Sequence, residues 1–301
     1  MDEVTRSYYE LTFKVSYMEK RGEEFQGFFS SIMEKKYPAD FIRVRPWGKS
    51  GDRKNDGYLG SRRMLFQSYA PNEITAASCI EKIDEDFNGA LPYWRQYFDA
   101  WTFVHNSREG LGPHVTDKIL ALRLAHSPLQ VLSWGFEELR QEAMSLATSE
   151  LASLLGPAPS LRGLIDLGLA ELSPILDHIS RLSLVPEPDL RPVPSDKLQR
   201  NLLSDSVAVL LKAGMSRADT LRRYFTLQPM LQDKIAASLQ TQYQTLKDKA
   251  LSPDDIFAGL QRFAGGEVVP KPGHQEAVLA TLAFFFEECD IFERPIPTGL
   301  Q

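Results

Sequence analysis

Cysteine is scarce in this sequence, with two residues among 301, Cys79 and Cys289. They lie far apart and lack the short spacing of metal-ligand pairs. We therefore expect both to be reduced core thiols in a protein from a reducing compartment.

Long apolar runs are also missing. No uninterrupted apolar segment approaches the ~20 residues that a membrane-spanning helix needs, so no such helix is expected. The acidic start Met1-Asp2-Glu3 is not followed by an apolar run, and we expect no signal peptide. No glycine-rich Walker loop is present, which excludes ATP binding of that type. Together these absences predict a cytoplasmic protein with no membrane partner.

The charge is unevenly distributed. A net charge of −6 argues against a protein that coats nucleic acid over its whole surface. Between Arg43 and Arg63, however, seven basic residues accompany only two acidic ones. A local positive field on an acidic protein suits a confined phosphate-binding surface. A solvated basic loop without a ligand explains the same charges equally well.

The N-terminal half contains both helical and extended patterns. Apolar residues at helical spacing predict helices over 21–37, 76–87, 91–98, 115–125 and 136–155. Alternating or buried apolar runs predict strands over 41–45, 56–59, 64–69 and 101–105. A short apolar run follows at 129–132. The pattern indicates an α/β domain with a central mixed sheet flanked by helices.

Beyond Gly156 the sequence changes character. Amphipathic helices are separated by proline-rich joints, and no convincing strand is present. The strongest helical patterns cover 198–212, 230–246 and 276–288. We therefore predict two domains, an α/β domain over 1–155 and an all-α domain over 156–301.

A candidate cation site lies in the N-terminal half. Asp56 precedes Gly57 at the start of a strand, and Gln67 is a lone polar residue within the next strand. Oxygen ligands are what Mg²⁺ or Mn²⁺ prefers, so Asp56, the Gln67 amide and the backbone carbonyl of Ser68 are candidate ligands. Asp52 is a weaker one. Glu24, on the first predicted helix, is placed to orient a metal-bound water.

These residues resemble a known pattern. The run Ser50-Gly51-Asp52-Arg53-Lys54-Asn55-Asp56-Gly57 is similar to the Ser-Gly-Asp-Gly-Gly-x-Asp-Gly run of Mrr-type restriction endonucleases, members of the PD-(D/E)xK superfamily. Phe66-Gln67-Ser68 takes the place of their Gln-x-Lys strand, and Glu24-Phe25-Gln26 resembles their Glu-Phe-Glu helix. The resemblance covers residues 20–105. It implies a restriction-endonuclease-like fold, Asp56 as central metal ligand, Gln67 as the second ligand position and Glu24 as the helix carboxylate.

Tyr69 departs from that pattern, because the family has a lysine two residues after the Gln. A phenol with a pKa near ~10 cannot supply the positive charge. Lys82, on the next predicted helix, is our candidate replacement, and Lys54 is the second option. The structural alternative for Lys82 is a solvated residue paired with Asp86 at i+4, worth only ~0.3–0.5 kcal/mol.

Basic residues around the candidate site are predicted to contact double-stranded DNA. They are Lys49, Arg53, Lys54 and Arg62.

The C-terminal half resembles another family. The ending Phe285-Phe286-Glu287-Glu288-Cys289-Asp290-Ile291-Phe292-Glu293 is similar to a recurring ending in bacterial ABC-three-component systems. The run Lys197-Leu198-Gln199-Arg200-Asn201-Leu202-Leu203 fits it too. The resemblance implies two partners, an SMC-type ATPase and a small middle subunit, in a complex directed against foreign DNA. The residue pattern alone indicates a helical domain for partner binding or homo-oligomerisation, or a buried core helix around Phe284.

Taken together, the sequence predicts a Mg²⁺- or Mn²⁺-dependent DNA endonuclease that acts as the effector of a bacterial anti-phage or anti-plasmid complex. Hydrolysis would proceed through metal-activated water. The alternative is a catalytically inactive nuclease-fold scaffold that binds DNA or docks the ATPase. Tyr69 favours the scaffold, whereas Glu24, Asp56 and Gln67 favour the enzyme.

Overall fold

The computed structural model describes residues 1–45, 53–182, 197–266, 273–288 and 291–292. The chain divides into two compact units, one of Phe13–Leu154 and one of Met1–Thr12 with Leu155–Gln301. The division falls within the first helix, α1 (Glu3–Glu19), which the sequence patterns did not predict. The predicted domain ranges, 1–155 and 156–301, stay a prediction.

A five-stranded mixed sheet forms the centre of the first unit, in the order β1-β2-β3-β4-β5. The strands are β1 (Phe41–Arg43), β2 (Gly57–Leu59), β3 (Met64–Tyr69), β4 (Ala100–His105) and β5 (Gln130–Trp134). β2 is antiparallel to both of its neighbours, β1 and β3, whereas β3, β4 and β5 are parallel to one another. This sheet agrees with the predicted α/β class, while a restriction-endonuclease fold stays a prediction.

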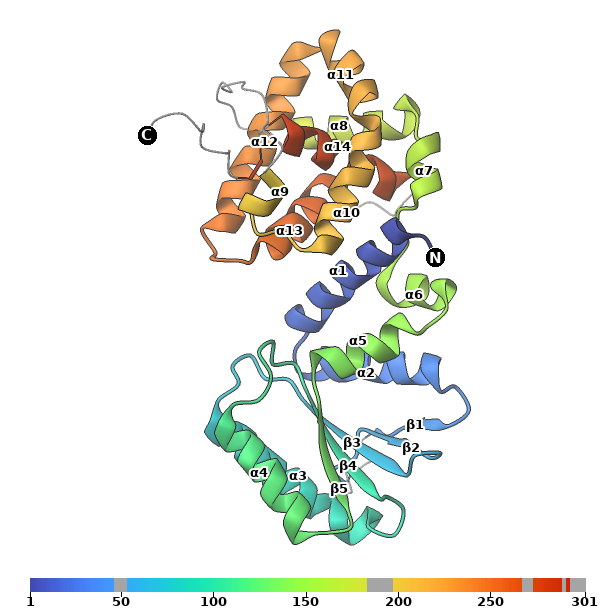
Figure 1. The fold of residues 1–301 in the computed structure, drawn as a ribbon, viewed down its shortest axis with the longest axis vertical. Helices are drawn as coiled ribbons and strands as arrows, with labels where there is room; N and C mark the ends of the chain where they lie inside the picture. Colours follow the sequence, from blue (N-terminus) through green and yellow to red (C-terminus); the bar gives the residue numbers. More distant parts are fainter. Residues whose placement is uncertain (46–52, 183–196, 267–272, 289–290, 293–301) are drawn as a thin grey trace. The chain divides into compact units, whose positions relative to one another are not determined.

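Helices cover both faces of the sheet (Figure 1). The covering helices are α2 (Gly22–Lys36), α3 (Ala76–Trp94), α4 (Pro113–Ala125) and α5 (Phe136–Met144), and α6 (Thr148–Leu155) follows α5 in the chain. On one face the ring of Phe66 packs against Phe29 of α2 and Trp134. On the other face Leu65 is buried with Ile83 of α3 and Ile119 of α4. Because side chains alternate along a strand, Gln67 and Tyr69 share the face that α3 and α4 cover.

Two sequence predictions for this unit need correction. The helices predicted over 76–87 and 91–98 are one helix, α3, which continues through Pro92. Pro92 lies in the last turn, where its missing N–H removes only one bond of an otherwise intact helix. The helix predicted over 136–155 is two helices, α5 and α6. The apolar run at 129–132, to which the sequence assigned no structure, overlaps the edge strand β5, which pairs in parallel with β4.

The second unit is helical throughout its described residues. Its helices are α7 (Leu161–Asp166), α8 (Leu169–Arg181), α9 (Lys197–Arg200), α10 (Asp205–Gly214), the short 3-10 helix η2 (Met215–Arg217), α11 (Ala218–Thr226), α12 (Pro229–Lys247), α13 (Pro253–Gly265) and α14 (His274–Glu287). The helix predicted over 198–212 is two helices, α9 and α10, with the N-cap Ser204 starting the second.

Helix α14 is the core of the helical unit. Ten successive residues, 277–286, are buried, and the helix packs against α8, α10 and α13. Phe284 and Phe285 both contact the ring of Phe225. The triple phenylalanine therefore belongs to a core helix, as one of the two interpretations of its sequence predicted.

Cys79 is a buried free thiol, as predicted, and burial raises its pKa to about 11. Cys289 lies outside the described residues. Across the ranges that the structure describes, no helix combines the length and apolar character needed to cross a bilayer.

Gly57 leaves room for the ring of Phe41 where β2 pairs with β1. A Cβ atom at this position would overlap the ring of Phe41, which is itself held against Phe29 and Phe66. Replacing Gly57 by alanine should therefore lower the free energy of unfolding by about 1–3 kcal/mol. Thermal unfolding measures the change.

Gly27 is the matched control for this variant. It lies within α2, and a Cβ there would meet only the end of the Arg43 side chain, at 4.0 Å. Gly27→Ala should raise stability by ~0.5–1 kcal/mol, because alanine loses less entropy in a helix. Equal effects of the two substitutions would contradict the close approach at Gly57.

Candidate metal and nucleic-acid site

The described residues donate three hydrogen bonds to the carboxylate of Asp56, which immediately precedes β2. Oδ1 accepts from Gln26 Nε2 at 2.7 Å, and Oδ2 accepts from the Ser68 backbone N–H at 2.7 Å and its hydroxyl at 2.6 Å. The side chain is buried, with 4% of its residue surface exposed. The carboxylate is thus held in one orientation on the sheet.

Gln67 and the Asp56 carboxylate lie on opposite faces of the sheet. Gly57 pairs with Phe66, and the Asp56 backbone N–H also donates to the Phe66 carbonyl, so a bulge places both residues opposite Phe66. The carboxylate thus contacts Gln26 of α2 and Ser68, whereas Gln67 points to the face that α3 and α4 cover. Gln67 is 5% exposed, and within the described part of the chain its Oε1 atom has no hydrogen-bond partner. A buried amide oxygen without a partner costs free energy, which is the condition that a bound cation would relieve.

Ser68 and Gln26 support the site in a way that the sequence did not predict. Ser68 was predicted to offer its backbone carbonyl to a metal, a role that stays a prediction; in the structure its N–H and hydroxyl orient Asp56. Glu24 is exposed on the first turn of α2, whereas Gln26, two residues later, contacts Asp56. The sequence signal for Gln26 was its place in the Glu24-Phe25-Gln26 run, where the resembling family has its second Glu.

Lys82 forms an ion pair with Asp86. Its Nζ lies 2.9 Å from Asp86 Oδ1, and Lys54 Nζ approaches the same oxygen at 3.1 Å. Burial raises the pKa of the Asp86 carboxyl, and the two lysines oppose that shift. This i+4 ion pair is the one that the structural alternative for Lys82 predicted. The catalytic role of Lys82 stays a prediction. Both candidate replacements for the missing lysine thus meet at one buried carboxylate.

Tyr69 is half-buried at the lysine position of the resemblance. Its ring lies 5.9 Å from that of Phe103 and packs against the core between the sheet and α3. The phenol therefore serves packing on this face of the sheet.

The predicted DNA-binding residues are tied to nearby side chains where they are described. The Arg53 guanidinium lies over the ring of Tyr93, 4.7 Å from its centroid. Arg62 donates to the Tyr37 hydroxyl at 2.9 Å and pairs with Glu142. Burial, followed by the neighbouring Glu142, raises the pKa of Tyr37 to about 12.

Two predicted site residues, Lys49 and Asp52, lie outside the described residues. Among those that are described, no group of three or more His, Cys, Asp or Glu side chains is arranged to hold a metal. The candidate cation ligands of the described chain are therefore one carboxylate, Asp56, and one amide oxygen, from Gln67.

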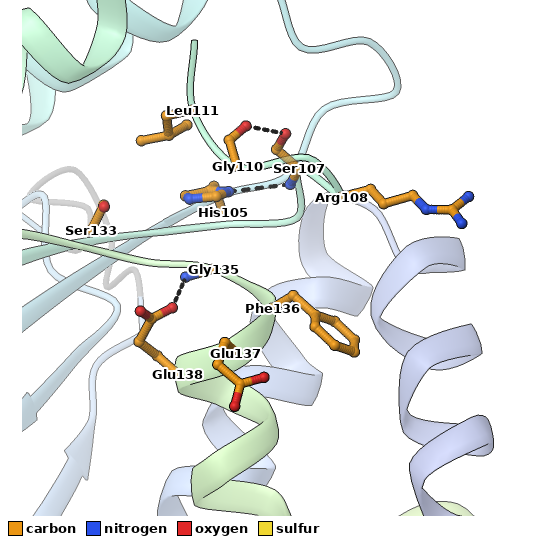
Figure 2. Close-up of a pocket in the computed structure, with 10 residues that line it drawn as sticks. All are labelled: His105, Ser107, Arg108, Gly110, Leu111, Ser133, Gly135, Phe136, Glu137 and Glu138. Carbon is orange, nitrogen blue, oxygen red and sulfur yellow. Dashed lines mark hydrogen bonds between the residues drawn. The ribbon is translucent and has the colours of Figure 1, made fainter. Parts of the chain in front are cut away.

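A second feature lies at the carboxyl ends of the parallel strands. His105, the last residue of β4, pairs in register with Tyr69 and borders a cavity of about 350 Å³ (Figure 2). Glu138 and Gly135, at the start of α5, border the same cavity. His105 is 3% exposed, and burial lowers its pKa to about 4, with Glu138 acting weakly in the opposite direction. Carboxyl ends of parallel strands are the usual place for ligands in α/β proteins.

Comparison with known proteins adds information for the helical unit alone. No curated protein and no solved structure matches the chain. In agreement with the resemblance predicted for the C-terminal half, residues 170–293 match the family model CTD10, described as C-terminal domain 10 of the ABC-three component (ABC-3C) systems.

Proposed function

We propose that this chain is the metal-dependent DNA endonuclease of an ABC-three-component defence complex. The helical unit would dock the complex's ATPase and middle subunit, and the α/β unit would cut DNA. The observation that carries the proposal is the buried Asp56 carboxylate, which Gln26 and Ser68 hold in one orientation just before β2.

The residues at this point fit Mg²⁺ or Mn²⁺. Asp56 supplies hard carboxylate oxygen atoms, and Asp52 and the Ser68 carbonyl are further candidates. The Gln67 amide would have to turn toward Asp56 from the other face of the sheet to complete the site. A bound ion would supply Lewis acidity and lower the pKa of a coordinated water. Gln26 and Ser68 would then act on the ligand, holding the Asp56 carboxylate in the orientation that the ion needs.

The other predicted catalytic residues have defined tasks in this proposal. Glu24, exposed at the start of α2, would accept a proton from the attacking water. Lys82 would have to exchange Asp86 for a DNA phosphate. Arg53, Arg62, Lys49 and Lys54 would contact the DNA backbone.

A catalytically inactive DNA-binding scaffold is the second candidate. The packing of Tyr69 on Phe103 favours it, because no cation occupies the family's lysine position. Such a scaffold would dock the ATPase and retain DNA without cutting it.

Substitutions at Gln67 test the metal site. Gln67→Leu should abolish the rise in melting temperature that Mn²⁺ causes in the parent, because the ion loses one of its oxygen ligands. Gln67→Glu should strengthen Mn²⁺ binding about tenfold or more, since a carboxylate adds charge to the site. Thermal unfolding at increasing Mn²⁺ concentration measures both, and plasmid nicking by the chain with its partner subunits is followed in parallel.

Gln130→Leu is the control, because Gln130 is an exposed residue at the start of β5 in the same sheet. It should leave the effect of Mn²⁺ unchanged. Nicking that persists in EDTA, or a Gln67→Leu variant that responds to Mn²⁺ like the parent, would refute the metal site. Mn²⁺ binding and DNA retention without nicking would establish the scaffold instead.

A further inference from the structure

The cavity beside His105 lies at the end of β4, two strands from β2, which Asp56 precedes, and one strand from β3, which carries Gln67. Tyr69 of β3 and His105 of β4 are paired, and Gln67 lies two residues before Tyr69 on the same face. Neighbouring strands are about 5 Å apart, so a DNA strand held at Asp56 would extend across this edge of the sheet.

His105 presents a buried hydrogen-bond donor at the cavity. Its Nδ1 accepts from the Ser107 backbone N–H at 3.2 Å, so this nitrogen carries no proton. The imidazole is neutral at pH 7, and its proton is therefore on Nε2. Among the described residues Nε2 has no hydrogen-bond partner. Figure 2 shows this ring nitrogen pointing away from Ser107, toward the side of the cavity where Ser133 lies.

Glu138 presents an acceptor at the same cavity. One of its oxygens, Oε2, accepts from the Gly135 backbone N–H at 2.9 Å and so caps α5. The capping interaction fixes the carboxylate at the start of the helix. Glu137 borders the cavity too, but its carboxylate is held by Arg140 at 2.7 Å and 2.9 Å.

The remaining walls are partly apolar, because Leu111 and Phe136 border the cavity. Phe136 is itself held between the rings of Phe13 and Tyr17. A cavity of about 350 Å³ is at the small end of ligand sites and takes a single small ring system.

A neutral donor, a carboxylate acceptor and apolar walls define the ligand's chemistry. A phosphate is disfavoured between His105 and Glu138, since the carboxylate repels an anion and the neutral imidazole brings no charge to offset it. Arg108 also borders the cavity, but its guanidinium points away from both residues (Figure 2). A metal ion is disfavoured because the described residues form no cluster of three or more ligating side chains. A nucleobase fits, because its Watson–Crick edge places an acceptor beside a donor on a flat apolar ring.

We propose that this cavity binds one unpaired DNA base, with His105 Nε2 donating to the base's acceptor and Glu138 accepting from its donor. The proposal rests on the proposed function, in that DNA is the substrate of the neighbouring site. A base in a duplex cannot enter, because its Watson–Crick edge is already paired. The cavity therefore selects single-stranded or locally unpaired DNA.

The proposal is tested by whether the Glu138→Gln substitution tightens or weakens the binding of a short DNA single strand. Glu138→Gln removes a negative charge, which by itself should tighten the binding of a polyanion. If Glu138 accepts a hydrogen bond from the base, the same variant should instead weaken binding of a pentathymidylate about tenfold or more. Fluorescence anisotropy with the full chain in EDTA measures this without any metal or cleavage, so failure of the nuclease proposal leaves the result readable.

Glu137→Gln is the charge-matched control from the same helical turn, and it should bind the pentamer as tightly as the parent or more tightly. Glutamine at 138 can still accept from Gly135, so the helix cap is kept, and the melting temperature verifies this. Equal effects of the two variants, or equal affinity for an abasic pentamer, would overturn the proposal.

Nuclear magnetic resonance gives a measurement that needs no variant. The pentathymidylate should shift the His105 Nε2–H resonance, whereas the abasic pentamer should not. An unchanged resonance at saturating pentathymidylate would overturn the assignment of His105 as the donor.

Discussion

Replacing Asp56 by alanine should reduce metal-dependent DNA cleavage roughly a thousandfold. Asp56 is the one carboxylate among the candidate ligands that the structure describes, so its loss leaves the ion without a charged ligand in that part of the chain. Metal assistance is worth several kcal/mol of transition-state stabilisation, and each ~1.4 kcal/mol is a factor of ten in rate. Single-turnover nicking of supercoiled plasmid in Mg²⁺ or Mn²⁺ measures the loss.

The variant must be separated from simple unfolding. Asp56→Ala also removes the acceptor of Gln26 and Ser68, which should destabilise the α/β unit by about 1–3 kcal/mol. Asp56→Asn keeps the side-chain shape and should lose as much activity at a smaller cost in stability. Asp99→Ala is the control, since Asp99 is an exposed residue of the same unit paired with Arg63. An Asp56→Asn variant that nicks plasmid at the parent rate would refute the role of Asp56.

The sequence predicts the sheet well because its strands carry strong local signals. The boundaries of β3 match the prediction, and those of β2 and β4 differ by one residue. Strict alternation across the short turn predicts Asp56 opposite Gln67, which is wrong, because a bulge at Asp56 turns its carboxylate toward Ser68 and α2. The edge strand β5 carried a weaker signal, since an apolar run of four residues is typical of either a strand or a buried helix.

Contacts between distant segments could not be predicted from local patterns. Gln26 reaches Asp56 across 30 residues of sequence, and Lys54 reaches Asp86 across 32. Which lysine lies near which carboxylate depends on how α3 packs on the sheet, and periodicity gives only its buried face. The same holds for the His105 cavity, because His105 and Glu138 meet only when β4 and β5 pair.

Lys197, in the run that resembles the ABC-three-component family, is a buried lysine that holds the end of α14 in the helical unit. Lys197 begins α9, yet its side chain is 2% exposed and its ammonium donates to the carbonyls of Phe286 at 2.7 Å and Ile291 at 2.6 Å. The ammonium also lies 4.4 Å from the centroid of the Phe286 ring. The lysine thus joins two segments of the family match, the Lys197 run and the ending after the triple phenylalanine.

Replacing Lys197 by methionine should destabilise the helical unit by about 3–5 kcal/mol. The methionine keeps most of the apolar stem but leaves two buried carbonyl oxygens without their charged donor. The midpoint of denaturant-induced unfolding, followed by circular dichroism, should fall accordingly. Lys212→Met is the matched control, because Lys212 is exposed on α10 of the same unit, and it should change stability by less than about 0.5 kcal/mol. Equal midpoints for the two variants would show that Lys197 does not hold the end of α14, whereas a selective loss at Lys197 would make this buried cation a structural requirement of the matched domain.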